Sequence, residues 1–212
     1  MRIKWFSLIR ITGLLLVLLY HFFQTIFPGG FFGVDVFFTF SGFLITALLV
    51  EEFSKNHEID LIGIFLGDVF YRIVPPVVLM VLVTMPFTFL VRQDYVAGIG
   101  GQIAGVLGFM TNFYELLTGG SYESQFIPHL FVHNWSLAVE VHYYILWGLA
   151  VWFLSKQAKS NGQLRGMVFL LSAAAFLISY FSMFIGSFLV TSYSSVYFSS
   201  LTMSIPSFWE VC

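Results

Sequence analysis

Residues 5–27 read WFSLIRITGLLLVLLYHFFQTIF, an apolar run that is long enough to cross a bilayer, because about 20 helical residues span its hydrocarbon core. The turn Pro28-Gly29-Gly30 separates this run from a second one at 31–50. The first run is too long for the apolar core of a signal peptide and has no small-residue cleavage site. Two adjacent runs of this kind predict a transmembrane helical hairpin.

The composition of the 212 residues agrees with a membrane protein. Apolar residues make up 58% of the chain and charged residues only 9%, whereas a soluble domain carries about 25% charged residues. A formal net charge of −2 provides no basic surface for nucleic acid. The single cysteine, Cys212, permits neither an internal disulfide nor a cysteine-rich metal site. An ordinary soluble domain is therefore excluded, and nucleic-acid binding is not expected.

The rest of the chain predicts further spans. Three more apolar runs of suitable length occupy residues 73–91, 135–154 and 167–190. The glycine-rich stretch 96–117 fits either a span or a re-entrant helix. Seven of the twenty charged residues fall within 51–72, which predicts a loop with an amphipathic piece at 62–70. The expected fold class is an all-α, polytopic transmembrane helix bundle with five to six spans, plus a partial last one at the end of the chain.

The distribution of Lys and Arg predicts the orientation. If 96–117 does not cross, eight of the nine basic residues lie on the N-terminal side and only Arg92 lies opposite. Positive charge marks cytoplasmic loops, so we expect a multi-pass protein of the cell membrane with a cytoplasmic N-terminus, five full spans and a re-entrant 96–117. If 96–117 does cross, the count is five against four and the orientation is undecided.

Three ionisable residues are expected at similar depth in the outer half of the bilayer. His21 lies about 9 Å below the end of the first run, Glu140 about 8 Å into the run that begins at Trp135, and Asp35 near the start of the second run. Ionisable side chains within a bilayer cost free energy unless they face a polar interior, so each of these residues is a candidate for function. A histidine beside a carboxylate can act as a general base toward a hydroxyl. The alternative is that Asp35 or Glu140 simply stabilises a helix start.

Two arginines are expected near the cytoplasmic face. Arg10 and Arg72 suit phosphate binding, because guanidinium binds phosphate through paired hydrogen bonds. The alternative is that Arg10 reaches the interface along its apolar stem and that Arg72 is an ordinary anchor. His129 and His133 have i, i+4 spacing without the glutamate of His-Glu-x-x-His, so no metal site is expected. Nucleophile-elbow, Walker A and dinucleotide motifs are absent from the sequence.

Four segments in order resemble the motifs of the integral-membrane acyltransferase family 3: LIRITGLLLVLLYHFF around Arg10 and His21, FFGVDVFFTFSGFLIT at 31–46, FYRIVPP at 70–76 and HNWSLAVEVHYYILW at 133–147. Within this family the chain is most similar to the N-terminal membrane part of streptococcal peptidoglycan O-acetyltransferases. The resemblance implies transfer of an acetyl group from cytoplasmic acetyl-CoA, as donor substrate with no bound cofactor, to a hydroxyl of an extracytoplasmic glycan.

The resemblance also implies roles for particular residues. His21 and Glu140 correspond to catalytic positions, and the positions of Arg10, Arg72 and Tyr144 correspond to donor or substrate binding; Asp35 is a further candidate for that binding role from its expected depth. Many family members have glutamine where this chain has His142. Residues 1–212 are expected to be the N-terminal portion of one family 3 membrane domain, without the family's remaining spans or its extracytoplasmic esterase-like domain. A transporter of acyl groups or small anions and an inactive membrane fragment are the alternatives.

Overall fold

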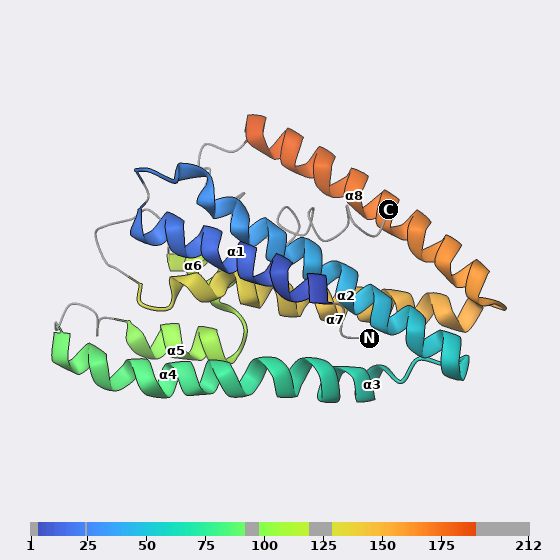
Figure 1. Ribbon diagram of the computed structural model, residues 1–212, viewed down its shortest axis with the longest axis horizontal. Helices are drawn as coiled ribbons and strands as arrows, with labels where there is room; N and C mark the ends of the chain where they lie inside the picture. Colours follow the sequence, from blue (N-terminus) through green and yellow to red (C-terminus); the bar gives the residue numbers. More distant parts are fainter. Residues whose placement is uncertain (1–3, 24, 92–97, 119–128, 190–212) are drawn as a thin grey trace.

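The computed structural model describes residues 4–23, 25–91, 98–118 and 129–189, and these residues form helices and no strands (Figure 1). The α-helices are α1 (Lys4–Phe22), α2 (Gly33–Asn56), α3 (Leu61–Ile64), α4 (Tyr71–Val91), α5 (Ile99–Leu107), α6 (Thr111–Thr118), α7 (Trp135–Gln157) and α8 (Asn161–Leu189). Two short 3-10 helices, η1 (Pro28–Phe32) and η4 (Val132–Asn134), and one π-helical turn, η2 (Phe65–Phe70), complete the described part. The all-α prediction is confirmed.

Four helical stretches of the described residues are long and apolar enough to cross a membrane: Gly33–Asn56, Leu61–Thr88, Val132–Gln157 and Asn161–Ser182. A shorter apolar stretch, Ile11–Phe22, lies in α1. Large apolar side chains on their outer faces are exposed, as expected of surfaces that face lipid; Leu79, Leu82 and Leu146 are examples. The structure thus agrees with a transmembrane bundle. The predicted partial last span falls on residues outside the described part.

The prediction of a loop over residues 51–72 is wrong. Helix α2 continues to Asn56, and α3, η2 and α4 follow one another as a continuous rod (Figure 1). Only residues 57–60 link the two helices, with His57 in the left-handed region at φ 54° and Asp60 accepting a 3.0 Å hydrogen bond from the Gly63 amide. The charged residues misled the prediction because apolar residues between them, Phe53 and Ile64 among them, are buried in the core.

Residues 98–118 form two short helices and not a span. α5 has nine residues and α6 has eight, too few to cross a bilayer. Phe109, with φ 53°, lies in the reversal between them. α5 packs on α4, and α6 packs on α7, at one end of the bundle (Figure 1). This arrangement agrees with the re-entrant alternative for 96–117.

The hairpin of α1 and α2 is packed closely through glycines. A side-chain carbon at Gly33 would lie 2.6 Å from the Gly13 carbonyl oxygen, and one at Gly30 would lie 2.5 Å from that of Leu16. Small residues of this kind let two membrane helices approach until their backbones touch. η1 therefore folds back directly on the last turns of α1, which fixes the end of α1 beside the start of α2.

Helices α2 and α7 form the centre of the bundle. Ile45 and Leu49 of α2 pack with Trp147 and Val151 of α7 in the largest cluster of buried apolar residues. The Trp147 indole donates a 2.8 Å hydrogen bond to the Thr46 hydroxyl across this interface. α8 covers one side of the pair and α4 lies on the other (Figure 1). The α2–α7 interface is consequently where side chains far apart in sequence meet.

Candidate functional site

A cavity of about 300 Å³ lies between α2, α7 and the rod that contains η2 and α4. Most of its lining is apolar, including Phe40, Leu44 and Val77. Its polar residues are Ser41, Arg72, Glu140 and Tyr144. An apolar cavity with a few converging polar groups is the usual form of a small-molecule site.

Glu140 is held at the wall of this cavity by two hydroxyl groups. Tyr144, one turn further along α7, donates a 2.7 Å hydrogen bond to Glu140 Oε1, and Ser41 of α2 donates a second bond to the same oxygen. Residues four apart share a helix face, so the sequence spacing already placed Glu140 and Tyr144 together. His142 lies on a different face, with its ring 5.5 Å from that of Phe113 on α6. The glutamate is therefore a positioned hydrogen-bond acceptor.

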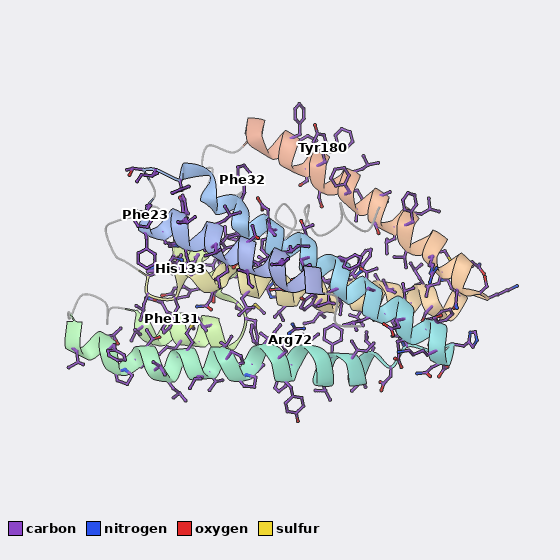
Figure 2. The ribbon with its side chains drawn as sticks, in the orientation of Figure 1. Phe23, Phe32, Arg72, Phe131, His133 and Tyr180 are labelled. Carbon is purple, nitrogen blue, oxygen red and sulfur yellow. The ribbon has the colours of Figure 1, made fainter. Side chains whose placement is uncertain are left out.

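Arg72 lies within the long rod formed by α3, η2 and α4, and its predicted position near the cytoplasmic face stays a prediction. It follows the π-helical turn η2 and is about 16 Å along the rod that begins at Leu61. Figure 2 shows it beside the middle of the bundle, and it is one of the residues that line the cavity. Among the described residues that line the cavity, Arg72 is the only cation. The cavity thus combines one guanidinium group with one carboxylate in apolar surroundings.

His21 lies in the last turn of α1 and is exposed. It was expected about one and a half turns below the helix end, but α1 stops at Phe22 and the chain turns back through η1. The ring Nδ1 is 2.8 Å from the Val17 carbonyl oxygen. Because a carbonyl can only accept, Nδ1 carries a proton in this contact.

The ring of His21 packs against His133, which lies in η4 just before α7 (labelled in Figure 2); the ring centroids are 4.9 Å apart at an angle of 72°. Glu140 follows His133 by seven residues, or about two helical turns and 10 Å of rise. The structure therefore brings His21 to His133, and Glu140 to Ser41 and Tyr144. A role of Glu140 in steadying the His21 ring stays a prediction.

The other two predicted site residues lie elsewhere. Asp35 is half-buried in the first turn of α2, where a negative charge is favoured by the helix dipole, and the cap position Phe32 offers no side-chain hydrogen bond. This location fits the alternative that Asp35 stabilises a helix start. Arg10 belongs to α1, but its side chain lies outside the described part of the structure.

Sequence reasoning missed several residues that the structure singles out. Ser41 carries no motif signal of its own. His129 does not pair with His133; its Nδ1 is 2.7 Å from Oε2 of Glu115, a buried carboxylate of α6. A lone carboxylate in an otherwise apolar stretch was the signal that could have identified Glu115. The described residues contain no group of three or more His, Cys, Asp or Glu side chains suited to a metal ion.

Comparisons with known proteins bear on this arrangement. The chain is 29% identical over 194 residues to the O-acetyltransferase OatA of Staphylococcus aureus strain NCTC 8325 / PS 47, covering 92% of this chain and 31% of that protein. It is 28% identical over 176 residues to the peptidoglycan O-acetyltransferase OatA of Listeria monocytogenes, covering 81% of this chain and 28% of the relative. The expected resemblance to membrane O-acetyltransferases is confirmed.

The chain spans about a third of the length of these relatives. No family model matches the sequence, and no solved structure matches it.

Proposed function

We propose that this chain belongs to a membrane O-acyltransferase, which moves an acetyl group from cytoplasmic acetyl-CoA to a hydroxyl of peptidoglycan outside the membrane. The similarity to proteins named O-acetyltransferase OatA over most of the chain supports the reaction and its acceptor. The observation that carries the proposal is the cavity within the helix bundle, where Ser41, Arg72, Glu140 and Tyr144 converge. An apolar cavity with a few polar groups, enclosed by helices of the bundle, gives an acyl group a place to bind.

The donor would enter from the end of the bundle that holds the links 57–60 and 158–160. Two contacts hold the two links together at this end of the bundle. Lys156 Nζ is 3.5 Å from a carboxylate oxygen of Glu58, and the Asn161 side chain donates a 2.9 Å hydrogen bond to the Ser54 hydroxyl. Lys55, Lys159 and Arg165 are exposed near these links. Because basic residues mark the cytoplasmic side, we assign this end and the N-terminus to the cytoplasm.

The opposite end of the bundle would face the glycan. It holds His21, His133 and the two short helices α5 and α6. In the proposed reaction His21 Nε2 removes the proton of an acceptor hydroxyl while its oxygen attacks the thioester carbonyl. The carbon–oxygen bond forms and the carbon–sulfur bond breaks; the thiolate takes the proton back from His21 and leaves as the free thiol, which restores the neutral imidazole.

The cavity residues would hold and polarise the donor. The guanidinium group of Arg72 has five N–H groups that can donate hydrogen bonds to oxygen atoms of acetyl-CoA. Arg10 would bind acetyl-CoA in the same way, nearer the N-terminal end of the chain. Glu140 fixes the two hydroxyls of Ser41 and Tyr144 in one orientation. Asp35, at the start of α2, stays a candidate for substrate binding at the outer end.

The test is a complementation experiment in the host. The gene is deleted and restored as wild type, His21→Ala or Glu140→Gln, and the ester-linked acetate released from purified peptidoglycan by mild base is measured. We expect acetate from the wild type only, at equal membrane abundance of all three proteins. Unchanged acetate after the deletion, or acetyl groups that cross vesicles without a covalent acceptor, would contradict the proposal, the second in favour of transport.

A further inference from the structure

A buried polar contact outside the cavity joins Glu115 of α6 to His129, which lies ahead of α7. Glu115 Oε2 is 2.7 Å from His129 Nδ1. The glutamate side chain is 1% exposed and that of the histidine 16%. The carboxylate therefore fixes the ring with Nε2 directed elsewhere, and no hydrogen bond to this Nε2 is found within the described residues. A buried carboxylate that orients a partly accessible imidazole is a built polar site.

Other buried polar atoms on α5 and α6 also lack partners within the described part of the chain. Glu115 Oε1, the Gln102 side-chain nitrogen and the Thr111 hydroxyl make no hydrogen bond within the described part of the chain. All three side chains are at most 2% exposed. The side-chain oxygen of Gln102 accepts a 3.4 Å hydrogen bond from the Phe131 amide, and the side-chain nitrogen is a donor without an acceptor within the described residues. Buried polar groups without partners are costly and rare, and they indicate a missing polar partner.

The chemistry of these groups selects the class of ligand. The carboxylate oxygen, the amide nitrogen and the hydroxyl are fully buried, whereas the His129 imidazole is partly accessible. Because Nδ1 donates to Glu115, Nε2 can accept a hydrogen bond, which the hydroxyl and amide groups of a neutral sugar can donate. The carboxylate disfavours the phosphates of a nucleotide donor through like-charge repulsion. An uncharged polyhydroxy ligand is the better partner.

The Glu115–His129 pair lies at the end of the bundle that also holds His21. The short segment from His129 to Asn134 carries His129 at its start and His133 near its end, and His133 contacts the His21 ring. The Asn134 side chain donates a 3.4 Å hydrogen bond to the Phe131 carbonyl, which closes this segment into a turn. A sugar bound at His129 would therefore lie within reach of the His21 end of the bundle.

We propose that the Glu115–His129 pair binds a hydroxyl or amide group of the acceptor glycan, with His129 Nε2 contacting the sugar and Glu115 as the positioning residue. This inference rests on the proposed acyl transfer and adds the acceptor site to it. The pair binds the acceptor and leaves proton transfer to His21.

The test measures transfer from labelled acetyl-CoA to soluble peptidoglycan oligosaccharides in membrane vesicles from the host. His129→Gln and Glu115→Gln are expected to raise the KM for the oligosaccharide about tenfold, the loss of one hydrogen bond to a ligand, with kcat and the KM for the donor within about twofold of wild type. A group that only supports the fold would lower the amount of protein and kcat without a selective change in acceptor KM.

The matched control is His142→Gln. His142 also lies against an aromatic ring of α6, at 5.5 Å from Phe113, as His129 lies 5.7 Å from Tyr114. We expect the control to keep the wild-type acceptor KM. An unchanged acceptor KM in both Glu115→Gln and His129→Gln, in vesicles where the wild type transfers acetyl groups, would overturn the inference and leave the proposed function standing. Vesicles in which the wild type transfers nothing would overturn both.

Discussion

Ser41 of α2 donates a hydrogen bond to Glu140 of α7, ninety-nine positions further along the chain. The bond crosses the central helix pair at the wall of the cavity that Arg72 also lines. Tyr144 donates to the same glutamate oxygen at 2.7 Å. One carboxylate thus organises two hydroxyl groups from two helices, and its loss would leave both without their acceptor.

Replacement of Glu140 by glutamine should lower acyl transfer by about 10²–10⁴-fold, the range typical of an acid–base group, because the amide loses the negative charge that the two hydroxyls are oriented toward. His142→Gln, on another face of the same helix, should be tolerated. Ester-linked acetate at equal membrane abundance decides between them. Near-normal acetate with Glu140→Gln and loss with His142→Gln would show that the choice of carboxylate is wrong.

His21→Ala should reduce acetylation to the level of the deletion strain, because the imidazole that we propose as the base is removed. The matched control is His57→Asn, at the link after α2, where asparagine accepts the left-handed backbone of His57. Peptidoglycan acetate is measured for both. Equal acetate in the two strains would exclude His21 as the base.

Arg72→Gln should raise the KM for the acetyl donor at least tenfold, since glutamine offers fewer donors and no charge in the apolar cavity. Arg72→Lys should lie between this variant and the wild type, because lysine keeps the charge without the planar fork. Arg165→Gln, exposed on α8, serves as the control. Initial rates in vesicles, measured against the concentration of the acetyl donor, give the donor KM of each of the three variants. A donor KM for Arg72→Gln equal to that of Arg165→Gln would refute a role of Arg72 in donor binding.

Gly33→Ala should destabilise the bundle by about 1–3 kcal/mol, because the added carbon would lie 2.6 Å from the Gly13 carbonyl oxygen and would force α1 and α2 apart. Gly100→Ala in α5 is the matched control, since no atom lies within 4 Å of the added carbon. Thermal unfolding in detergent, followed by circular dichroism, should show a lower midpoint for the first variant only. Equal midpoints would mean that the hairpin is more loosely packed than described.

The orientation can be tested by cysteine labelling in intact cells, in a Cys212→Ser background. A membrane-impermeant maleimide should label Thr118→Cys, at the exposed end of α6, and should not label Lys159→Cys between α7 and α8 until the cells are opened. The expectation follows from the eight basic residues on the N-terminal side. The reverse pattern would place His21 on the cytoplasmic side and invert the proposed reaction.

The structure confirms the parts of the fold that follow from local composition. Long apolar runs gave the helical bundle, and the i, i+4 spacing placed Glu140 and Tyr144 on one face. The prediction was wrong for residues 51–72, where charge density suggested a loop. Helix continuity there depends on burial of apolar residues such as Ile64 against α7, which the local sequence does not reveal.

What the sequence by itself determined is the membrane class, the glycine turn after α1 and the identity of most of the ionisable residues that matter, because each depends on short-range pattern or on the cost of charge in lipid. The partners of those residues were decided only by tertiary structure. His21 meets His133, Glu140 meets Ser41, and Glu115 meets His129, through contacts that depend on where helices end and how they pack. The end of α1 at Phe22 places His21 in the last helical turn, and the continuous rod from Leu61 places Arg72 about 16 Å from the start of that rod, because helix length sets the height of every side chain that the helix carries.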